Sequence, residues 1–177
     1  MRGRWAQATA LATALLLTAC NLRPIYAGGP QGPAAATLAS IEIAPIPDRA
    51  GYLVRQQLLQ RLQPADRPAY RLEVTLDDKI TGFGIRTDTS IARERRTLRA
   101  RYRLVATASN AVVLDATAAT DEGIDVVRSE YAVVAAEQTA LDRLAVSLAE
   151  QITGRIALFA HERGNAAPPP APLPPPK

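Results

Sequence analysis

Residues 91–108 alternate apolar and basic side chains with a period of two, and no other stretch constrains the fold as strongly. The apolar side chains stand at even positions: Ala92, Leu98, Ala100, Tyr102 and Leu104. Five arginines stand at odd positions: Arg93, Arg95, Arg99, Arg101 and Arg103. Successive side chains of a strand point to opposite faces of a sheet, so this pattern predicts a strand with one buried and one basic face.

Three other stretches are predicted strands. Residues 38–46 alternate and end at Pro45 and Pro47, which cannot donate hydrogen bonds to a sheet. Residues 70–77 alternate apolar and polar side chains in the same way. Residues 112–120 follow a turn at Ser109-Asn110, so we expect a hairpin over 91–120. The acidic pairs Asp77-Asp78 and Asp121-Glu122 are expected in solvated turns at strand ends.

Two stretches have helical periodicity. Asp48, a good N-cap residue, precedes a helix to about residue 63 with Val54, Leu58 and Leu62 at i+4 spacing. A long helix begins near Ser129, capped by Ser129 or by Asp125. Its apolar residues recur every three or four positions: Leu141, Leu144, Leu148, Ile152, Ile156 and Phe159. The order β-α-β-β-β-α predicts a two-layer α/β (α+β) sandwich, in which two helices cover one face of a four-stranded mixed sheet.

The N-terminus has the pattern of a secretion signal. Arg2 and Arg4 precede an uncharged apolar run that ends at Leu17-Thr18-Ala19-Cys20. The run is shorter than the roughly 20 apolar residues that span a bilayer. Leu-Thr-Ala-Cys resembles the bacterial lipobox, in which the cysteine is lipidated. An ordinary signal peptide with an incidental Cys20 is the alternative.

These patterns divide the chain into four segments. We predict a lipoprotein signal peptide over 1–19, a flexible lipidated tether over 20–37, the sandwich domain over 38–163 and a disordered proline-rich tail over 164–177. Lipidation would consume Cys20, the only cysteine, so the domain has no disulfide to stabilise it. Asn21 follows the cysteine, which resembles the outer-membrane class of lipoproteins.

Charge and motifs favour no catalytic or nucleic-acid function. The net charge of +4 falls to +2 when Arg2 and Arg4 leave with the signal, too little to indicate nucleic-acid binding. The only histidine, His161, lies at the end of the last predicted helix with no nucleophile pattern near it. No P-loop, Gly-x-Ser-x-Gly or metal-ligand spacing occurs. We therefore predict a protein without enzymatic activity, metal or cofactor.

The opening of the mature chain resembles a known family. Residues Cys20-Asn21-Leu22-Arg23-Pro24-Ile25-Tyr26 resemble the Cys-Gly-Phe-x-Pro-Leu-Tyr opening of the LPS-assembly lipoproteins, the LptE family, with Asn21 in place of Gly. The resemblance continues through Ile46-Pro47-Asp48-Arg49 and the helix after it. It also includes the last helix, from Ser129-Glu130-Tyr131-Ala132 to the basic-apolar turn at 155–159, and covers about residues 17–160.

The resemblance implies a function and partners. LptE lipoproteins are anchored in the outer membrane and sit inside the large LptD β-barrel, so the domain is expected on the periplasmic side or in the barrel lumen. They help that barrel assemble, and they bind lipopolysaccharide during its export to the cell surface. An auxiliary lipoprotein of a periplasmic ABC-type lipid transporter is the alternative, and a membrane-tethered enzyme is a third possibility.

The five arginines are the candidate contact site for lipopolysaccharide phosphates or an acidic partner wall. Arginine binds phosphate and carboxylate groups in a bidentate manner. The alternative is a solvated face that Glu73, Asp77 and Asp115 partly neutralise from neighbouring strands. No lipopolysaccharide-contact residue of the family is transferred to this chain.

Overall fold

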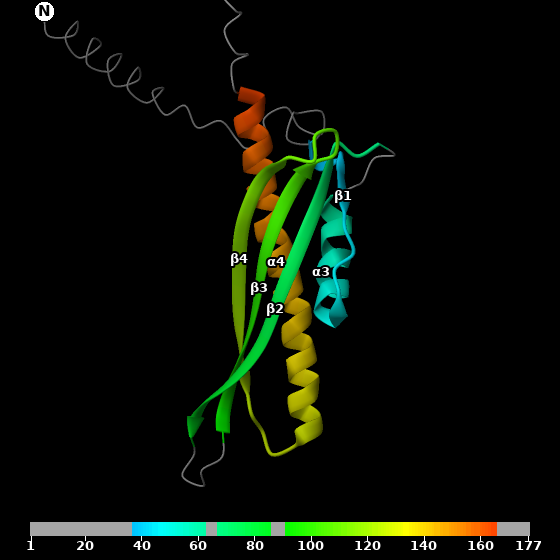
Figure 1. The fold of residues 1–177 in the computed structure, drawn as a ribbon. Coiled ribbons are helices and arrows are strands. Elements are labelled where there is room, and N and C mark those ends of the chain that lie inside the picture. Colours follow the sequence, from blue (N-terminus) through cyan, green and yellow to red (C-terminus); the bar gives the residue numbers. More distant parts are fainter. Residues whose placement is uncertain (1–36, 63–66, 86–90, 166–177) are drawn as a thin grey trace, which may run out of the picture.

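A computed structural model describes residues 37–62, 67–85 and 91–165 of the chain. The elements are β1 (Ile41–Ile43), α3 (Asp48–Arg61), β2 (Tyr70–Ile85), β3 (Ile91–Ala106), β4 (Val112–Asp125) and α4 (Glu130–Asn165) (Figure 1). The predicted signal peptide, Cys20, most of the tether and most of the proline-rich tail lie outside the described residues.

The described strands form one mixed sheet in the order β1-β2-β3-β4. β1 pairs parallel with β2, and the other neighbours pair antiparallel. Helices α3 and α4 lie on the same side of this sheet (Figure 1). The structure therefore confirms the predicted α+β class and the order β-α-β-β-β-α. We call the helix-covered side the inner face and the opposite side the outer face.

The core fills the space between the inner face and the two helices. The even positions of β3 predicted to face the core are buried from Leu98 to Leu104. They pack against Leu58 of α3 and against Leu148 and Ile152 of α4 in one cluster. The side chain of Ala92 lies outside the described part. Apolar periodicity thus located both covering helices.

Strand lengths differ from those predicted. β1 has only three residues, because the chain leaves the sheet after the Ala44 N–H has donated to the Leu72 carbonyl oxygen at 3.0 Å. β2 continues through Gly82 and Gly84, and β4 continues to Asp125, because pairing with β3 extends to that end. Both acidic pairs therefore lie inside strands, and the prediction of solvated turns is wrong.

The helix ends decide two questions about capping. Pro47 occupies the cap position of α3 with no side-chain hydrogen bond, so the expectation that Asp48 caps this helix is wrong. Asp48 is instead its first residue, with a φ of 66° that aspartate tolerates better than most residues. At α4, Ser129 is the cap: its Oγ accepts from the Ala132 N–H at 3.4 Å. The other candidate, Asp125, belongs to β4.

Candidate functional site

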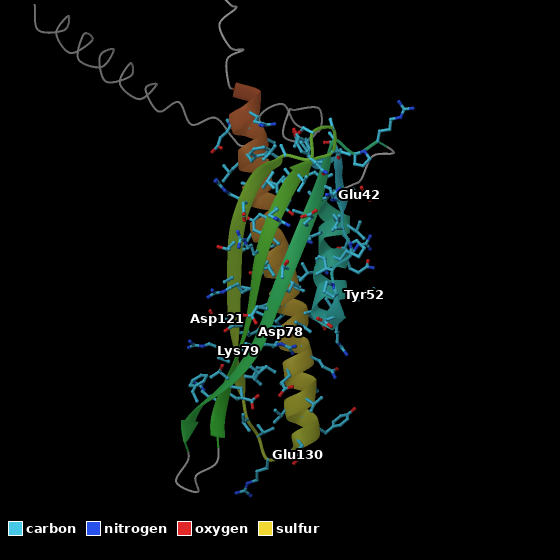
Figure 2. All side chains as sticks on the ribbon, in the orientation of Figure 1. Glu42, Tyr52, Asp78, Lys79, Asp121 and Glu130 are labelled. Carbon is cyan, nitrogen blue, oxygen red and sulfur yellow. The ribbon has the colours of Figure 1, made fainter. Side chains whose placement is uncertain are left out.

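The five arginines lie together on the outer face, as the alternation predicts. All five side chains are exposed, and they follow β3 along most of its length. Figure 2 shows how the strand alternation separates charges on the neighbouring strands: Lys79 and Asp121 project away from α4, whereas Asp78 lies on the side of α4. We call Arg93, Arg95, Arg99, Arg101 and Arg103 the arginine row.

Carboxylates of β2 and β4 pair with four of the five arginines. The ion pairs are Arg93–Asp125 at 2.8 Å, Arg95–Asp121 at 3.6 Å, Arg101–Asp115 at 3.0 Å and Arg103–Glu73 at 2.9 Å. Each acid comes from a neighbouring strand whose register places it beside the row. The outer face is therefore a lattice of alternating charges rather than a uniformly positive surface.

Arg99 is the exception in the row. Its register partners are Asp77 on β2 and Ala119 on β4. Among the residues that the structure describes, no carboxylate lies within ion-pair distance of Arg99. A hollow of about 240 Å³ lies beside it, lined by Thr117, Ala118 and Ala119. Arg99 is thus a guanidinium next to open space.

The ion pairs shift the pKa values of the paired groups. Hydrogen bonding from Arg71 lowers the pKa of Glu73, and the charge of Arg103 lowers it further. Hydrogen bonding from Arg101 lowers the pKa of Asp115, and Asp115 in turn raises the pKa of Arg101. These three groups therefore keep their charges more firmly than isolated side chains would.

A second charged group, which the sequence pattern does not predict, lies on the inner face. Arg96 forms a bidentate pair with Asp78, from Nε to Oδ1 at 2.9 Å and from Nη2 to Oδ2 at 2.6 Å. Its Nη1 donates to the Glu137 carbonyl oxygen of α4 at 2.8 Å. A basic residue at an even position, where the strand is otherwise largely apolar, was the signal that could have identified it.

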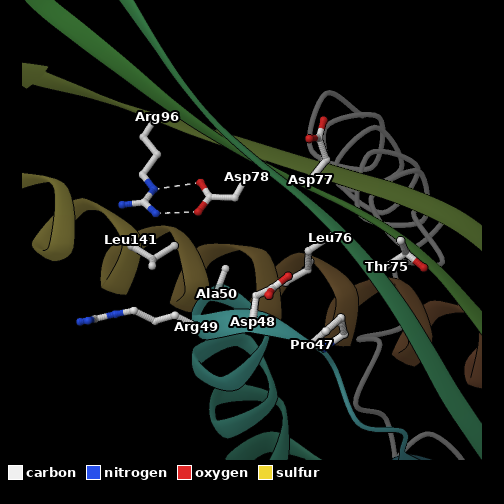
Figure 3. Close-up of a pocket in the computed structure, with 10 residues that line it drawn as sticks. All are labelled: Pro47, Asp48, Arg49, Ala50, Thr75, Leu76, Asp77, Asp78, Arg96 and Leu141. Atoms are coloured by element: carbon white, nitrogen blue, oxygen red, sulfur yellow. Dashed lines mark hydrogen bonds and ion pairs between the residues drawn. The ribbon is translucent and has the colours of Figure 1, made fainter.

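This pair borders a cavity of about 390 Å³ at the start of α3. Pro47, Arg49 and Ala50 line it from the helix side, and Leu76 lines it from β2 (Figure 3). Figure 3 shows Arg96 and Asp78 joined on one side of the cavity, with Leu141 of α4 close by. Because Asp78 already satisfies the Arg96 guanidinium, this cavity lacks a free charged group on that wall.

Glu94 lies near Arg96 on the same face of β3. Its Oε2 is buried and has no hydrogen-bond partner. Burial raises the pKa of Glu94, and the nearby Glu137 carboxyl raises it further. The inner face near the β2–β3 connection therefore holds a carboxyl group that is poorly accommodated as an anion.

Neither charged group contains a histidine or a cysteine. His161 lies near the C-terminal end of α4, where the sequence predicts it. Across residues 37–62, 67–85 and 91–165, no three His, Cys, Asp or Glu side chains form a possible metal site. None of the described helices is long and apolar enough to cross a membrane. The arginine row is an exposed charged surface, most of whose side chains pair with carboxylates of the neighbouring strands.

Comparison with known proteins places the chain in a family context. A family model described as "LptE: Lipopolysaccharide-assembly" matches residues 38–156. No curated protein matches the chain. Residues 38–156 contain all four strands, α3 and most of α4.

Solved structures share the fold. A crystal structure of a candidate lipoprotein from Caulobacter crescentus CB15 is 24% identical, with a TM-score of 0.60, and covers 73% of this chain and 98% of its own. The rare lipoprotein B from Shewanella oneidensis is 12% identical, with a TM-score of 0.53, and covers 71% and 98%. An uncharacterized lipoprotein B from Nitrosomonas europaea is 12% identical, with a TM-score of 0.54, and covers 67% and 82%. At these identities the similarity establishes a common fold.

Proposed function

The chain belongs to the LptE family of lipopolysaccharide-assembly proteins, and from this premise we propose its role. It is an outer-membrane lipoprotein that fills an LptD-type β-barrel, helps that barrel assemble and binds lipopolysaccharide during export. The observation that carries the proposal is the family match over residues 38–156, which includes the whole described sheet.

The outer face supports a location against a polar wall. No described helix covers it, and four of the five arginines of the row are held in ion pairs with single carboxylates. Large outer-membrane barrels have polar interiors. A surface of mixed charges can exchange its exposed ion pairs for pairs with such a wall at little cost, since each exposed pair contributes only about 0–1 kcal/mol.

One part of the arginine row supports binding to lipopolysaccharide phosphates. A hollow of about 380 Å³ on the outer face is lined by Glu73, Thr75, Arg101 and Arg103. Both guanidiniums are exposed and pair with a single carboxylate each. A phosphate carries more charge than a carboxylate and accepts bidentate hydrogen bonds from arginine, so it can compete for both groups.

The anchor is the lipidated Cys20. A triacylated cysteine exceeds the two lipid signals that stable membrane anchoring needs. The domain is then fixed to the outer membrane without a spanning segment.

Co-purification tests the barrel partnership. The full chain, affinity-tagged at its C-terminus, is expressed in a diderm bacterium and extracted from the outer membrane with mild detergent. We expect an LptD-type barrel to co-purify in a stoichiometric amount. Recovery of inner-membrane ABC transporter subunits in place of the barrel would instead assign the chain to lipid transport as an auxiliary lipoprotein.

Charge removal tests the lipopolysaccharide contact. The double variant Arg101→Gln/Arg103→Gln is compared with Arg49→Gln/Arg128→Gln, which removes the same charge from exposed positions outside the strands of the outer face. We expect the first pair to weaken binding of purified lipopolysaccharide and to reduce its dependence on salt, because exposed charges are screened within about 8 Å at physiological ionic strength. Equal binding by the two double variants would make the row a solvated face.

A further inference from the structure

The free edge of the sheet at β4 presents main-chain groups that no described strand pairs. β4 is the last strand of the sheet, and it pairs on one side only, with β3. Its 14 residues make it one of the three long strands. Long, unprotected edges are templates for the addition of another strand.

The register identifies which β4 residues face outward. The main-chain groups of the even residues of β2 point toward β1. The Tyr70 N–H donates to the Ser40 carbonyl oxygen at 3.1 Å, and the Leu72 carbonyl oxygen accepts from the Ala44 N–H. In an antiparallel ladder the main-chain groups of successive residues alternate between the two sides. Odd residues of β2 and β3 therefore bond to each other, and even residues of β3 bond to even residues of β4. The odd residues of β4 are left with outward N–H and C=O groups: Asp115, Thr117, Ala119, Asp121 and Gly123.

One contact independently confirms this direction. The Gln151 side chain of α4 reaches the Ala119 carbonyl oxygen with its Nε2, at 3.5 Å. That oxygen therefore points away from β3. At 3.5 Å the contact is at the limit of a hydrogen bond, so an incoming N–H can replace it.

β4 lacks two of the usual protections of an edge strand, and its charged side chains Asp115, Asp121, Glu122 and Asp125 are each paired with an arginine. Between Leu114 and Asp125 the strand has no proline and no lysine. Its one register irregularity lies at the turn end, opposite Leu104/Val105. The open part of β2 beyond Leu72 differs, because the first turn of α3 approaches it across the cavity of Figure 3. β4 is thus the edge better suited to pairing.

The charges beside this edge select an occupant. Asp115 and Asp121 are neutralised by Arg101 and Arg95. Between them stand Thr117 and Ala119, two short side chains, with the unpaired Arg99 behind Ala119 in the register. The hollow lined by Arg99, Thr117 and Ala119 leaves space beside these short side chains for a longer side chain from outside.

We propose that the open edge of β4 binds an extended segment of a partner polypeptide that places an acidic side chain opposite Ala119. An added strand lies about 4.8 Å from β4, and its main chain satisfies the outward groups of residues 115–123. Its carboxylate reaches across Ala119 to Arg99. This inference does not rest on the proposed function, because it uses neither Cys20 nor the hollow at Arg101 and Arg103.

Two capped synthetic peptides test the proposal: Thr-Val-Thr-Glu-Thr-Val-Thr and its counterpart with a central Gln. The full chain in detergent is mixed with each, and residue-resolved amide hydrogen exchange is measured. We expect slower exchange at Thr117, Ala119 and Asp121. The Glu peptide should bind about two- to fivefold more tightly than the Gln peptide, as expected for one exposed ion pair.

Three variants separate the main-chain and charge contributions. Arg99→Gln should abolish the preference for Glu over Gln, whereas Arg101→Gln, whose native side chain is already paired with Asp115, should keep it. Ala119→Pro removes one outward N–H at a position where an edge strand tolerates proline, and it should weaken both peptides equally. The Arg99 comparison remains decisive if this proline variant fails to fold.

Three results would overturn the proposal. The first is equal affinity of the native chain for the two peptides. The second is protection at Leu76 and Ile80 on the β2 edge in place of the β4 residues. The third is self-association of the chain that Ala119→Pro abolishes, which would assign the β4 edge to a second copy.

Discussion

Arg96 and Asp78 face each other as two forks on the inner face, with Nε–Oδ1 and Nη2–Oδ2 distances of 2.9 and 2.6 Å. Their side chains are 13% and 25% exposed, which makes them the most buried ion pair among the described residues. Since Arg96 also donates to the Glu137 carbonyl oxygen, a single guanidinium joins β2, β3 and α4. Asp78 raises the pKa of Arg96 through this hydrogen bonding.

Removing this guanidinium should loosen α4 from the sheet. We expect Arg96→Met to lower the free energy of unfolding by about 1–3 kcal/mol, because Asp78 and the Glu137 carbonyl lose their partner in a partly buried place. Arg93→Met breaks an ion pair whose side chains are 64% and 75% exposed, and it should cost less than about 1 kcal/mol. Urea unfolding of both variants measures the difference, and equal losses would contradict this role for Arg96.

Glu94 should make stability depend on pH. Its pKa in the folded chain lies above the ordinary 4.5, so the folded state binds this proton more tightly than the unfolded state. The contribution of Glu94 is therefore fully present below pH 4.5 and is lost as the pH rises through the raised value. Glu94→Gln should remove this loss and be at least as stable as the native chain at neutral pH.

Urea unfolding over a pH series measures the Glu94 effect. The exposed Glu162→Gln makes the same chemical change on α4 and should follow the native profile. If the stability of Glu94→Gln changed with pH in parallel with that of the native chain, the Glu94 carboxyl would not cause the loss of stability at higher pH. Glu73 and Asp115 have lowered pKa values and act in the opposite direction, since their contribution is lost on acidification.

Replacing Gly51 in α3 by any residue with a Cβ atom should destabilise the fold. A Cβ atom at this position would lie 2.6 Å from the Ile46 carbonyl oxygen, which is a main-chain atom that cannot move aside. We expect Gly51→Ala to cost about 1–3 kcal/mol through overpacking. Gly154→Ala is the matched control in α4, where a Cβ meets nothing within 4 Å, and it should stabilise the helix by about 0.5–1 kcal/mol. Thermal unfolding of the two variants should therefore shift in opposite directions.

Lipidation is predicted at Cys20, which lies outside the described residues. Cys20→Ala should leave an uncleaved or mislocalised precursor, because the thiol that receives the lipid is gone. Metabolic labelling with palmitate, followed by membrane fractionation, measures the effect. Palmitate label that persists in the Cys20→Ala chain would contradict the prediction.

The parts of the fold that follow from local periodicity could be predicted, and the ends of the elements could not. Alternation assigned Leu98 and Tyr102 to the buried face because it needs only the period of a strand. The length of β4 depends instead on pairing with β3, for example of Asp125 with Arg93, and such pairing is a tertiary property. The far end of β2 depends on the same pairing: the strand continues past Gly84, whose φ is 76°, to pair Ile85 with Ile91.

The candidate site was likewise predictable only in its placement. A period of two puts all five arginines on one face, but which of them is neutralised depends on the register. Arg101 lies beside Asp115, whereas Arg99 lies beside Ala119 and keeps no carboxylate within ion-pair distance in the described part. The role of Arg96 on the inner face could not be predicted without the position of α4, because the Glu137 carbonyl oxygen of that helix accepts a hydrogen bond from Arg96.

The lengths of the longest elements set how far the molecule can reach. β2, with 16 residues, is about 53 Å long at 3.3 Å per residue, and α4, with 36 residues, is about 54 Å long at 1.5 Å per residue. Each is longer than the roughly 40–45 Å of a bilayer with its headgroups. β1 pairs with Tyr70–Leu72 at the start of β2, and β2 ends at Ile85, at the far end of the sheet (Figure 1). If a lipid before β1 held the chain at a membrane, the β1 end of the domain would lie nearest the anchor. The far end of β2 would then lie about one membrane thickness away from it, as at the end of a rigid spacer.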